Sequence, residues 1–570
     1  MLGKLRSTAL VITVLAMGCS SSGDNSGFGD DDPSKNPTNG TSSGDPGSSS
    51  SSGGFGQGTG DQLIVDPSNG AVFIETATNP ATPGKLAYTV KLKTAGGEKD
   101  LTADAKFTVE DTSLGSFAGA TFTTVNALPP NTLGKSTLVR VESQSYKGIA
   151  NLTVVALRRT GPNRDFYFYE PYGQPPNPAN DVLKFSTNIK LVDVAFVMDT
   201  TGSMGGSITA LKNALQGSLL TQLQAAIPNV AMAVVDHRDY PVGPIIGGYG
   251  SPGDWPVKVH QVMTTDINLV KTGVGKYVAG GGNDGPESQI PAMQHTLTGE
   301  ALLWSGGSIA AHTPAAGTTG GVDFRPGAVP VVVLITDIDW HGENHTPYNF
   351  TTPTMASLKA AFAAKNARFV DITSGDESQA NELSDATGSS VPVGSFGSVA
   401  GCSATQCCTG VNGAGRAPNG PGGKCRLNFL HSDGNGVSNA VAKGIEAIAV
   451  GSSFDVTAKP SNDPKNPGGV DATKFIKALR AKDEGDAAAG CPAQAAVDTN
   501  GDGIKDTFKT VKVGTPVCFE IVPAQNDFVQ PTLDPQFFKA FIDVLGMPGS
   551  IQLDRRDVTF LVPPKDALAK

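Results

Sequence analysis

A short polar loop at the end of an apolar run carries the side chains best suited to chemistry. The run "LVDVAFVMD" covers residues 191–199 and ends in an aspartate, and "TTGSM" follows it directly. Asp199, Thr201 and Ser203 stand two residues apart, so their oxygens can converge on one point in a loop before a helix. Carboxylate and hydroxyl oxygens suit Mg²⁺, Mn²⁺ or Ca²⁺ rather than zinc or copper. The spacing therefore predicts a divalent-cation site.

Buried strands that alternate with helices must position this loop. The runs "VAMAVVD" (230–236) and "VPVVVLITD" (329–337) are continuously apolar, as strands covered on both faces are. Helical spacing of apolar residues marks 267–278 between them. A further helical stripe follows the polar loop: Ile208, Leu211, Leu215, Leu219 and Leu223. The alternation predicts an α/β fold with a doubly wound parallel sheet over residues 189–450, flanked by all-β modules.

Ligands of such a sheet bind beyond the C-terminal ends of its strands, and a second expected strand also ends in an aspartate, Asp337. "DTTGSM" after one strand, with "VVVLITD" later, resembles the von Willebrand factor A domain and its metal-ion-dependent adhesion site. The family's pattern is Asp-x-Ser-x-Ser with a distal threonine and aspartate. Thr201 replaces the first serine but keeps the hydroxyl, and Asp337 matches the distal aspartate.

The third contribution to the site comes from a glycine-rich segment. "GGGNDGPESQIPAMQH" (280–295) resembles the integrin β-subunit version of the site, in which a Pro-Glu pair supplies the carboxylate. The resemblance implies Glu287 as the contributor, with Asp284 as the alternative. "VAMAVVDHRDYP" resembles the second-strand segment of many bacterial members, where the residue at the position of Asp239 is structural rather than a ligand.

The resemblance implies binding rather than catalysis. In the family, a carboxylate of a protein ligand completes the coordination of the cation, so we expect Mg²⁺ or Mn²⁺ and a partner that presents Asp or Glu. Two alternatives stay open: a metal-dependent hydrolase that uses His341, Glu343 and His345, and an inert structural surface protein. "HGENH" lacks the His-Glu-x-x-His order, and its Gly and Asn disfavour a helix. We therefore expect a loop there and no enzyme.

A second cation signal lies near the C-terminus. "VDTNGDGIKDTF" (497–508) resembles an EF-hand-like calcium loop, in the shortened form of dockerin or thrombospondin type 3 repeats. Lys509 stands where the full motif has a bidentate glutamate. The ligands that the resemblance implies for Ca²⁺ are Asp498, Asn500, Asp502, Ile504 (through its carbonyl) and Asp506. A solvated acidic turn is the alternative.

Six cysteines lie beyond the N-terminal region, an even number that favours disulfides in an exported chain. They allow 15 pairings, of which we expect Cys491 with Cys518. The other four fall in a glycine-rich insert at 401–425: Cys402, Cys407, Cys408 and Cys425. A zinc site in this insert is the alternative to disulfides.

The N-terminus has the features of an export signal. Lys4 and Arg6 precede a short apolar run, which predicts a signal peptide over residues 1–18. "LAMGC" resembles the lipobox of bacterial lipoproteins, which implies a lipidated Cys19; an ordinary secretory signal is the alternative. The almost wholly polar stretch 19–60 predicts a flexible tether. The residue after Cys19 is not the aspartate that retains lipoproteins in the inner membrane, which favours the outer membrane and the cell surface.

The flanks of the central region are expected to be β-rich. Alternating runs between turn signals predict a β-sandwich over residues 61–160, and "VEDTSLGSFAGATFTT" within it resembles a bacterial immunoglobulin-like module. A Pro- and aromatic-rich connector is expected at 161–188 and a β-rich module at 451–570. The formal net charge of −10 disfavours nucleic acid as a partner. The sequence thus predicts a lipid-anchored surface protein that binds through a metal ion.

Overall fold

The computed structural model describes residues 54–55 and 61–565 with short internal gaps. These gaps are 162–163, 217–218, 220–221, 224–226, 243–247, 397–400, 433 and 435. The signal peptide predicted at 1–18, the lipidation at Cys19 and nearly all of the tether at 19–60 lie outside the described residues. Within the described ranges, no helix combines the length and the apolar character that crossing a membrane requires.

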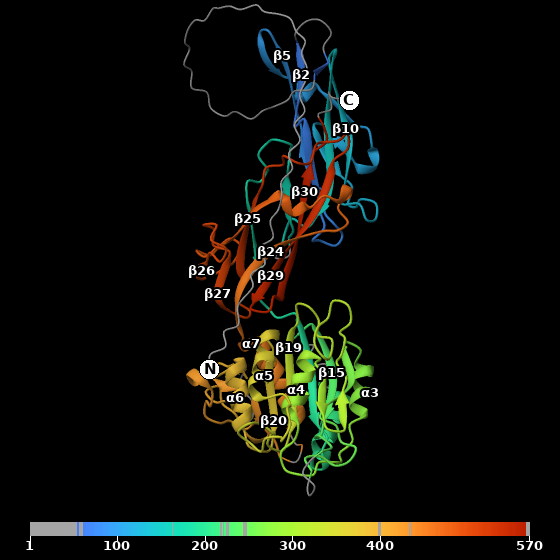
Figure 1. Cartoon of the computed structure of the whole chain (residues 1–570). Helices are drawn as coiled ribbons and strands as arrows, with labels where there is room; N and C mark the ends of the chain where they lie inside the picture. The colour runs from blue at the N-terminus through green and yellow to red at the C-terminus, as the bar shows by residue number, and fades with distance from the viewer. Residues whose placement is uncertain are drawn as a thin grey trace, which may run out of the picture. The chain divides into compact units, whose positions relative to one another are not determined.

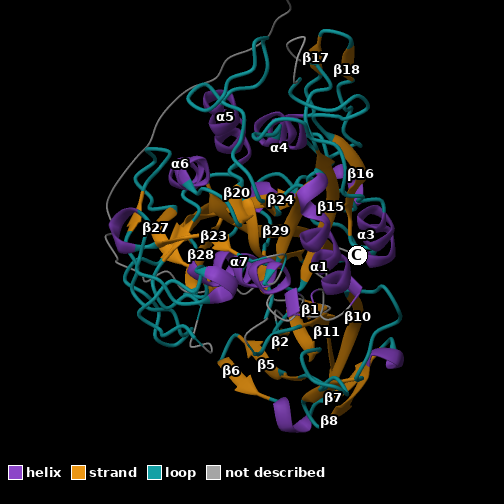
Figure 2. Cartoon of the chain, turned by 90° about the horizontal axis from the view of Figure 1, so that it is seen from below, coloured by secondary structure: helices purple, strands orange, loops and turns teal. Residues whose placement is uncertain are grey.

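The described residues are mainly β-structure, which Figure 2 shows as the predominance of orange strands over purple helices. Strand accounts for 39% and helix for 19%, and most of the sheets are antiparallel or mixed. The prediction of a doubly wound α/β parallel sheet is therefore wrong. It extended a pattern of alternating strands and helices from one region to the fold class, although the flanks supply most of the strands. The sheet of that region is itself mixed.

The central sheet has six strands in the order β16-β15-β14-β19-β20-β23. They are β14 (Leu191–Asp199), β15 (Asn229–His237), β16 (Lys258–Thr264), β19 (Val329–Thr336), β20 (Arg368–Thr373) and β23 (Asn428–Leu430). Five of them run parallel, whereas the edge strand β16 runs antiparallel to β15. In register, Asp199 pairs with His237, and Met198 pairs with Ile335. Asp199 therefore ends β14, and Asp337 directly follows the neighbouring strand β19 at the same edge of the sheet.

Six α-helices are described, and Figure 2 shows them on both faces of this sheet, whose strands β15, β19 and β20 are labelled in Figure 1. They are α1 (Gly205–Gln216), α3 (Ile267–Gly275), α4 (Gln289–Thr298), α5 (Met355–Lys365), α6 (Ser378–Thr387) and α7 (Val437–Gly451). Val194 and Phe196 of β14 share one core with α1, α3 and α7, while Ala195 and Val197 share another with α4, α5 and α6. Alternate side chains of a strand point to opposite faces, which is why a continuous apolar run is needed here. The helical stripe from Ile208 to Leu223 is buried, as predicted.

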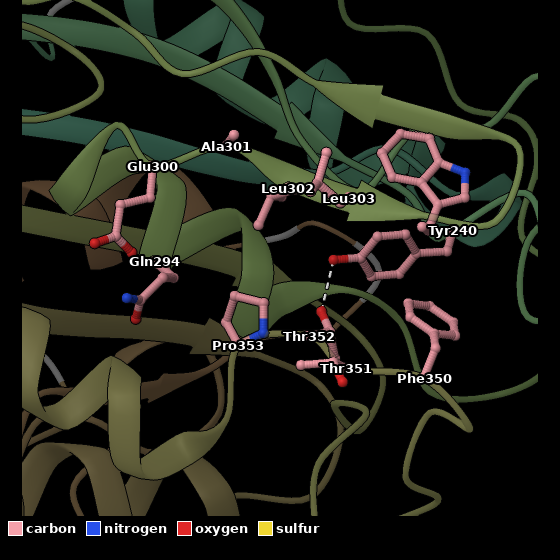
Figure 3. Close-up of a pocket in the computed structure, with 11 residues that line it drawn as sticks. Tyr240, Gln294, Glu300, Ala301, Leu302, Leu303, Phe350, Thr351, Thr352 and Pro353 are labelled. Carbon is pink, nitrogen blue, oxygen red and sulfur yellow. Dashed lines mark hydrogen bonds between the residues drawn. The ribbon is translucent and has the colours of Figure 1, made fainter.

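Two small hairpins complete the central region. Strands β17 (Leu302–Trp304) and β18 (Gly307–Ile309) follow α4, and β17 lines the pocket drawn in Figure 3. Strands β21 (Ser390–Val391) and β22 (Cys425–Arg426) flank the cysteine-rich insert.

The N-terminal module is all β, with a core of its own. Its strands are β1 (Gly54–Phe55), β2 (Gln62–Asp66), β3 (Asn69–Glu75), β4 (Lys85–Ala87), β5 (Thr89–Thr94), β6 (Gly97–Asp100), β7 (Lys106–Val109), β8 (Gly115–Ala118), β9 (Thr121–Thr124), β10 (Gly134–Ser143) and β11 (Tyr146–Leu157). Along β3 and β5, buried residues alternate with more exposed ones, because one face of each strand packs on the core. The immunoglobulin-like resemblance of this module stays a prediction.

The C-terminal module draws strands from both sides of the central region. Its later strands are β24 (Ser453–Asn462), β25 (Ile476–Ala481), β26 (Ala496–Val497), β27 (Thr507–Lys512), β28 (Val517–Pro523), β29 (Gln536–Met547) and β30 (Ile551–Val562). Strand β12 (Phe166–Tyr169) pairs parallel with β30, and β13 (Asp181–Phe185) pairs antiparallel with β28. The segment 161–188, expected as a connector, therefore supplies two strands to this module.

Candidate metal centre

Asp199 ends β14 with its side chain fully buried and its carboxylate held by three hydrogen bonds. Its Oδ1 accepts hydrogen bonds from the backbone N–H of Thr201 at 2.9 Å and from the Thr201 hydroxyl at 2.6 Å. Its Oδ2 accepts one from the Thr336 hydroxyl, at the end of β19, at 2.9 Å. The loop then turns through a short 3-10 helix, Gly202–Met204, into α1. These bonds fix the first part of the predicted site at the strand edge.

Ser203 and Asp337 meet at the same edge. The Ser203 hydroxyl donates to the Asp337 carboxylate, which is half-buried after β19. Burial raises the pKa of Asp337, the Ser203 hydrogen bond opposes that rise, and the carboxylate of Asp199 adds to it. The structure therefore brings the two aspartates that the sequence analysis selected into electrostatic contact.

Glu287 completes the group from the other side. Its side chain is 3% exposed, and its Oε2 has no hydrogen-bond partner. A Cβ added at Gly282 would lie 2.7 Å from Glu287 Oε1 and 3.3 Å from Thr201 Cβ, so the glutamate faces the threonine across this glycine. Burial first, and then the Asp199 carboxylate, raise the pKa of Glu287 to about 10. A buried carboxyl group among other carboxylates requires a proton or a cation.

The glycines of the 280–288 loop allow this approach. Gly281 and Gly282 adopt φ angles of +77° and +75°, which side chains rarely tolerate. A Cβ at Gly281 would lie 2.0 Å from Asp254 Oδ1, while the Gly282 backbone N–H donates to Asp254 Oδ2 at 2.9 Å. At the far end of the loop, the Glu287 N–H donates to the carbonyl of Asp339 at 3.2 Å. The loop is thus fixed at both ends against the strand edge.

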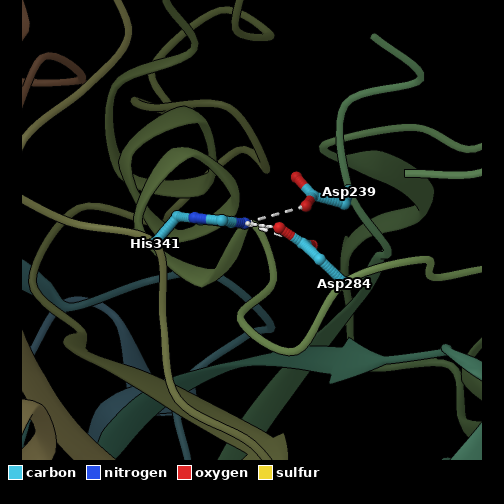
Figure 4. A group of neighbouring side chains, drawn as sticks. All are labelled: Asp239, Asp284 and His341. Atoms are coloured by element: carbon cyan, nitrogen blue, oxygen red, sulfur yellow. Dashed lines mark hydrogen bonds and ion pairs between the residues drawn. The ribbon is translucent and has the colours of Figure 1, made fainter. Parts of the chain in front are cut away.

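A second cluster of possible ligands lies beside the first and is drawn in Figure 4. One ligand atom from each of Asp239, Asp284 and His341 lies within 4.8 Å of the other two. Asp239 and His341 are buried, whereas Asp284 is exposed. His341 Nε2 lies 3.3 Å from Asp239 Oδ2 and 3.4 Å from Asp284 Oδ2. This group could hold a metal ion.

The histidine is oriented so that its Nε2 faces the two carboxylates. His341 Nδ1 hydrogen-bonds the backbone carbonyl of Thr346, which can only accept, so Nδ1 carries a proton. Burial lowers the pKa of His341, but the hydrogen bond and charge of Asp239 outweigh it, and the net shift is upward. Without a metal ion the ring is therefore favoured as an imidazolium. With one, neutral Nε2 would be a ligand, fixed by the outer hydrogen bond at Nδ1.

The two groups form one acidic site. Three further carboxylates raise the pKa of Glu287 in the same direction as Asp199: Asp239, Asp284 and Asp254. Arg238 pairs with Asp254 at 3.1 Å and offsets part of this charge. Among the described residues, one group of three His, Cys, Asp or Glu residues has ligand atoms that all lie within 4.8 Å of one another, and it consists of Asp239, Asp284 and His341. The group around Asp199 is looser, as expected where hydroxyls and water share the coordination.

From the sequence, we expected a structural role for Asp239, and Asp284 only as the alternative to Glu287. The second cluster could not be predicted, because its members come from three segments with no common spacing. Of the three residues considered for a hydrolase, His341 lies in the acidic site, whereas Glu343 and His345 are exposed. Reciprocal backbone hydrogen bonds between Gly342 and His345 close a turn there, which confirms the expected loop.

The predicted calcium loop connects β26 to β27 and is exposed. The carboxylate of Asp498 accepts backbone N–H groups of Gly501 at 2.7 Å and Gly503 at 2.8 Å, and these bonds lower its pKa. Asp502 accepts the N–H of Ile504 at 2.8 Å, and Asp506 accepts the Thr499 hydroxyl at 2.7 Å. The Asn500 side chain accepts the N–H of Asp502. The loop satisfies its own carboxylates, so calcium binding there stays a prediction.

The disulfide predicted between Cys491 and Cys518 is confirmed. The four cysteines of the insert also pair, Cys402 with Cys408 and Cys407 with Cys425. Zinc binds thiolates, so the zinc alternative for this insert does not hold in the disulfide-bonded protein.

No family model and no curated protein sequence matches the chain. Among solved structures, it is similar to a von Willebrand factor type A protein from Catenulispora acidiphila, with 12% identity over 82% of this chain and 75% of the other, at a TM-score of 0.25. It is also similar to the pilus adhesin SpaC from Lactobacillus rhamnosus GG in an open conformation, with 11% identity over 80% of this chain and 55% of the adhesin, at a TM-score of 0.24. Values this low determine neither fold nor function, so the site rests on its own geometry.

Proposed function

We propose that this protein is an adhesion-type binding protein that holds a divalent cation in the acidic site and engages a carboxylate of a partner protein through it. The observation that carries the proposal is the environment of Glu287. Its Oε2 is buried and unpartnered, and the charge of Asp199 opposes its ionisation. A cation would satisfy the oxygen and offset the repulsion together.

The donor set fits a hard cation. The residues that would hold it are Asp199, Thr201, Ser203, Glu287 and Asp337. All of their side-chain donors are oxygens, which suits Mg²⁺ or Mn²⁺. The bound ion would supply a positive centre with an open position for one further oxygen. An Asp or Glu side chain of a partner would fill that position, so one ion would add affinity to a small interface.

The cluster of Asp239, Asp284 and His341 would hold a second ion, and it prefers a different metal from the first site. Asp239 and Asp284 offer oxygens and His341 offers a ring nitrogen, a set that Mn²⁺ or Zn²⁺ accepts better than Mg²⁺ does. The alternative for this cluster is a protonated histidine between two aspartates, with no metal ion. Titration with Mn²⁺ separates the two, because only a metal site would lose bound ion in a His341→Gln variant.

The setting that we propose is the bacterial cell envelope. A lipid anchor on Cys19 and a polar tether would display the folded part to extracellular or envelope proteins, and Ca²⁺ in the 498–506 loop would suit that setting. Metabolic labelling with an alkyne-tagged fatty acid tests the anchor. We expect label on the wild-type protein and none on Cys19→Ser, and equal labelling of both would contradict the anchor.

The decisive experiment is calorimetric titration of Mg²⁺ and Mn²⁺ into the full chain. Asp199→Asn keeps the size of the side chain and removes its charge, so we expect a loss of affinity of at least about tenfold. Asp104→Asn is the matched control, because Asp104 is exposed in the N-terminal module. A folded wild-type protein that binds neither ion would contradict the proposal. Chelator-sensitive hydrolysis of peptides or esters would instead favour the hydrolase.

A further inference from the structure

A pocket of about 540 Å³ lies in the central region. Figure 3 shows its two ends. Tyr240 and Phe350 lie at one end, and Gln294 and Glu300 lie at the other. Trp304, which also lines the pocket, contacts the ring of Tyr240. Leu302 of β17 and Pro353 lie between the two ends. The pocket is therefore long, with an aromatic end and a polar end.

Aromatic contacts connect this pocket to the acidic site without a break. The Tyr348 hydroxyl donates to the carboxylate of Asp239, and its ring lies 4.2 Å from that of His341. The ring of Tyr240 lies 5.0 Å from the ring of Tyr348 and 5.4 Å from that of Trp304. The Tyr240 backbone N–H also donates to Asp239 Oδ1 at 2.6 Å. The aromatic end of the pocket is thus joined to the acidic site through Tyr240 and Tyr348.

The polar end of the pocket presents hydrogen-bond acceptors. Gln294 lies on α4 with 7% of its surface exposed, and its Oε1 has no hydrogen-bond partner. A buried amide oxygen without a donor is unfavourable, so a ligand group that donated a hydrogen bond to it would be stabilised. The Glu300 carboxylate lies at the same end and is exposed. None of the residues that line the pocket is basic.

We infer that this pocket binds an arginine or lysine side chain of the partner protein, adjacent to the Asp or Glu that reaches the cation. The inference rests on the proposed function and adds a second determinant to it. The cationic head would donate to Gln294 Oε1 and to the Glu300 carboxylate, while the aliphatic stem would lie along Leu302 and Pro353. The chain's formal net charge of −10 also favours a basic partner segment.

The test uses Nα-acetyl-L-arginine amide as the probe and Nα-acetyl-L-citrulline amide as its neutral counterpart, with the full chain and calorimetric or NMR detection. We expect the arginine probe to bind at least about tenfold more tightly than citrulline. Glu300→Gln should remove most of that preference. Glu343→Gln should not, because Glu343 is exposed near the acidic site but does not line the pocket. Gln294→Met should weaken both probes.

The outcomes separate this inference from the proposed function. Mg²⁺ binding without a preference for arginine would overturn the pocket assignment and leave the metal site standing. Arginine binding that survives in Asp199→Asn, which has lost the cation, would support the pocket independently. Equal binding of both probes, or binding of methyl glycosides in place of arginine, would show that the pocket takes another class of ligand. If Gln294→Met does not fold, Glu300→Gln still decides, because Glu300 is exposed.

Discussion

A buried glutamate beside strand β12 should make the C-terminal module sensitive to pH. Glu170 follows β12, and its backbone N–H donates to the carbonyl of Leu561 at 2.8 Å. Its side chain is 0% exposed, and neither carboxylate oxygen has a hydrogen-bond partner. Burial raises the pKa of Glu170 from 4.5 to about 8. The folded module therefore binds this proton much more tightly than the unfolded chain does.

The sign of the effect follows from linkage. A group with a raised pKa in the folded state stabilises fully below its unfolded pKa, and that stability is lost as pH rises through the folded pKa. The pKa of Glu170 rises from 4.5 to about 8 on folding. At about 1.4 kcal/mol for each tenfold change in proton affinity, the bound proton adds at most about 5 kcal/mol to the free energy of unfolding, and this contribution is lost between pH 4.5 and pH 8. Between pH 5 and pH 8.5, Glu170 alone should lower the free energy of unfolding by about 4 kcal/mol.

Glu170→Gln should remove this dependence, because the amide does not titrate in the range. Thermal unfolding of the full chain by calorimetry at pH 5 and pH 8.5 measures it, and the transition that shifts in the variant identifies the module. At pH 8.5 the variant should be more stable than the wild type, while at pH 5 the two should be close. Asp534→Asn, an exposed acid-to-amide change in the same module, should leave the slope unchanged. An identical slope in wild type and Glu170→Gln would refute the reasoning, since it would mean that the native carboxyl is ionised and hydrated.

Three further predictions concern the loops and the disulfide. Gly282→Ala places a methyl group against the buried carboxylate of Glu287 and strains a positive φ, so the affinity for Mg²⁺ should fall at least about tenfold. Gly285→Ala is the control, because its Cβ would meet nothing within 4 Å, and it should leave the affinity unchanged. Replacing Cys491 and Cys518 by serine opens a link with a sequence separation of 27, and chemical denaturation should show a loss of about 3.5 kcal/mol from loop entropy. His341→Gln should weaken Mn²⁺ binding at least about tenfold in calorimetry, and no change would assign the ring a charge-pairing role instead.

Local patterns carried much of what the sequence predicted correctly. The run 191–199 forms β14 with the expected bounds, because a strand covered on both faces needs apolar side chains at every position. The polar loop after it turns at the strand edge, since hydroxyl and carboxylate side chains satisfy the backbone there. Glu287, which the resemblance implied as a ligand, faces Thr201 across Gly282, and its role as a ligand stays a prediction.

Pairing between distant segments explains what the sequence did not predict. Strands β12 and β13 pair with strands that follow them by more than 300 residues, and a Pro- and aromatic-rich composition gave no sign of these partners. The predicted fold class, a doubly wound parallel sheet, was wrong for a related reason. Local periodicity shows where strands lie but not which strands pair, and those outside the central region form antiparallel and mixed sheets. The cluster of Asp239, Asp284 and His341 likewise depends on three loops that only the tertiary fold brings together.

The aromatic side chains around the acidic site bear on how strongly a single ion could bind. The rings of Tyr249 and Tyr348 lie 5.1 Å and 4.2 Å from that of His341, and Tyr348 donates its hydroxyl to Asp239. Apolar rings on this side lower the local dielectric, so the attraction between a cation and a carboxylate is larger than it would be in water. The same burial raises the cost of leaving the carboxylates unpaired. Both effects favour an occupied site, and a partner carboxylate that reaches the ion would gain from the same low-dielectric surroundings. That is why we attribute binding to a few buried charges rather than to a large contact area.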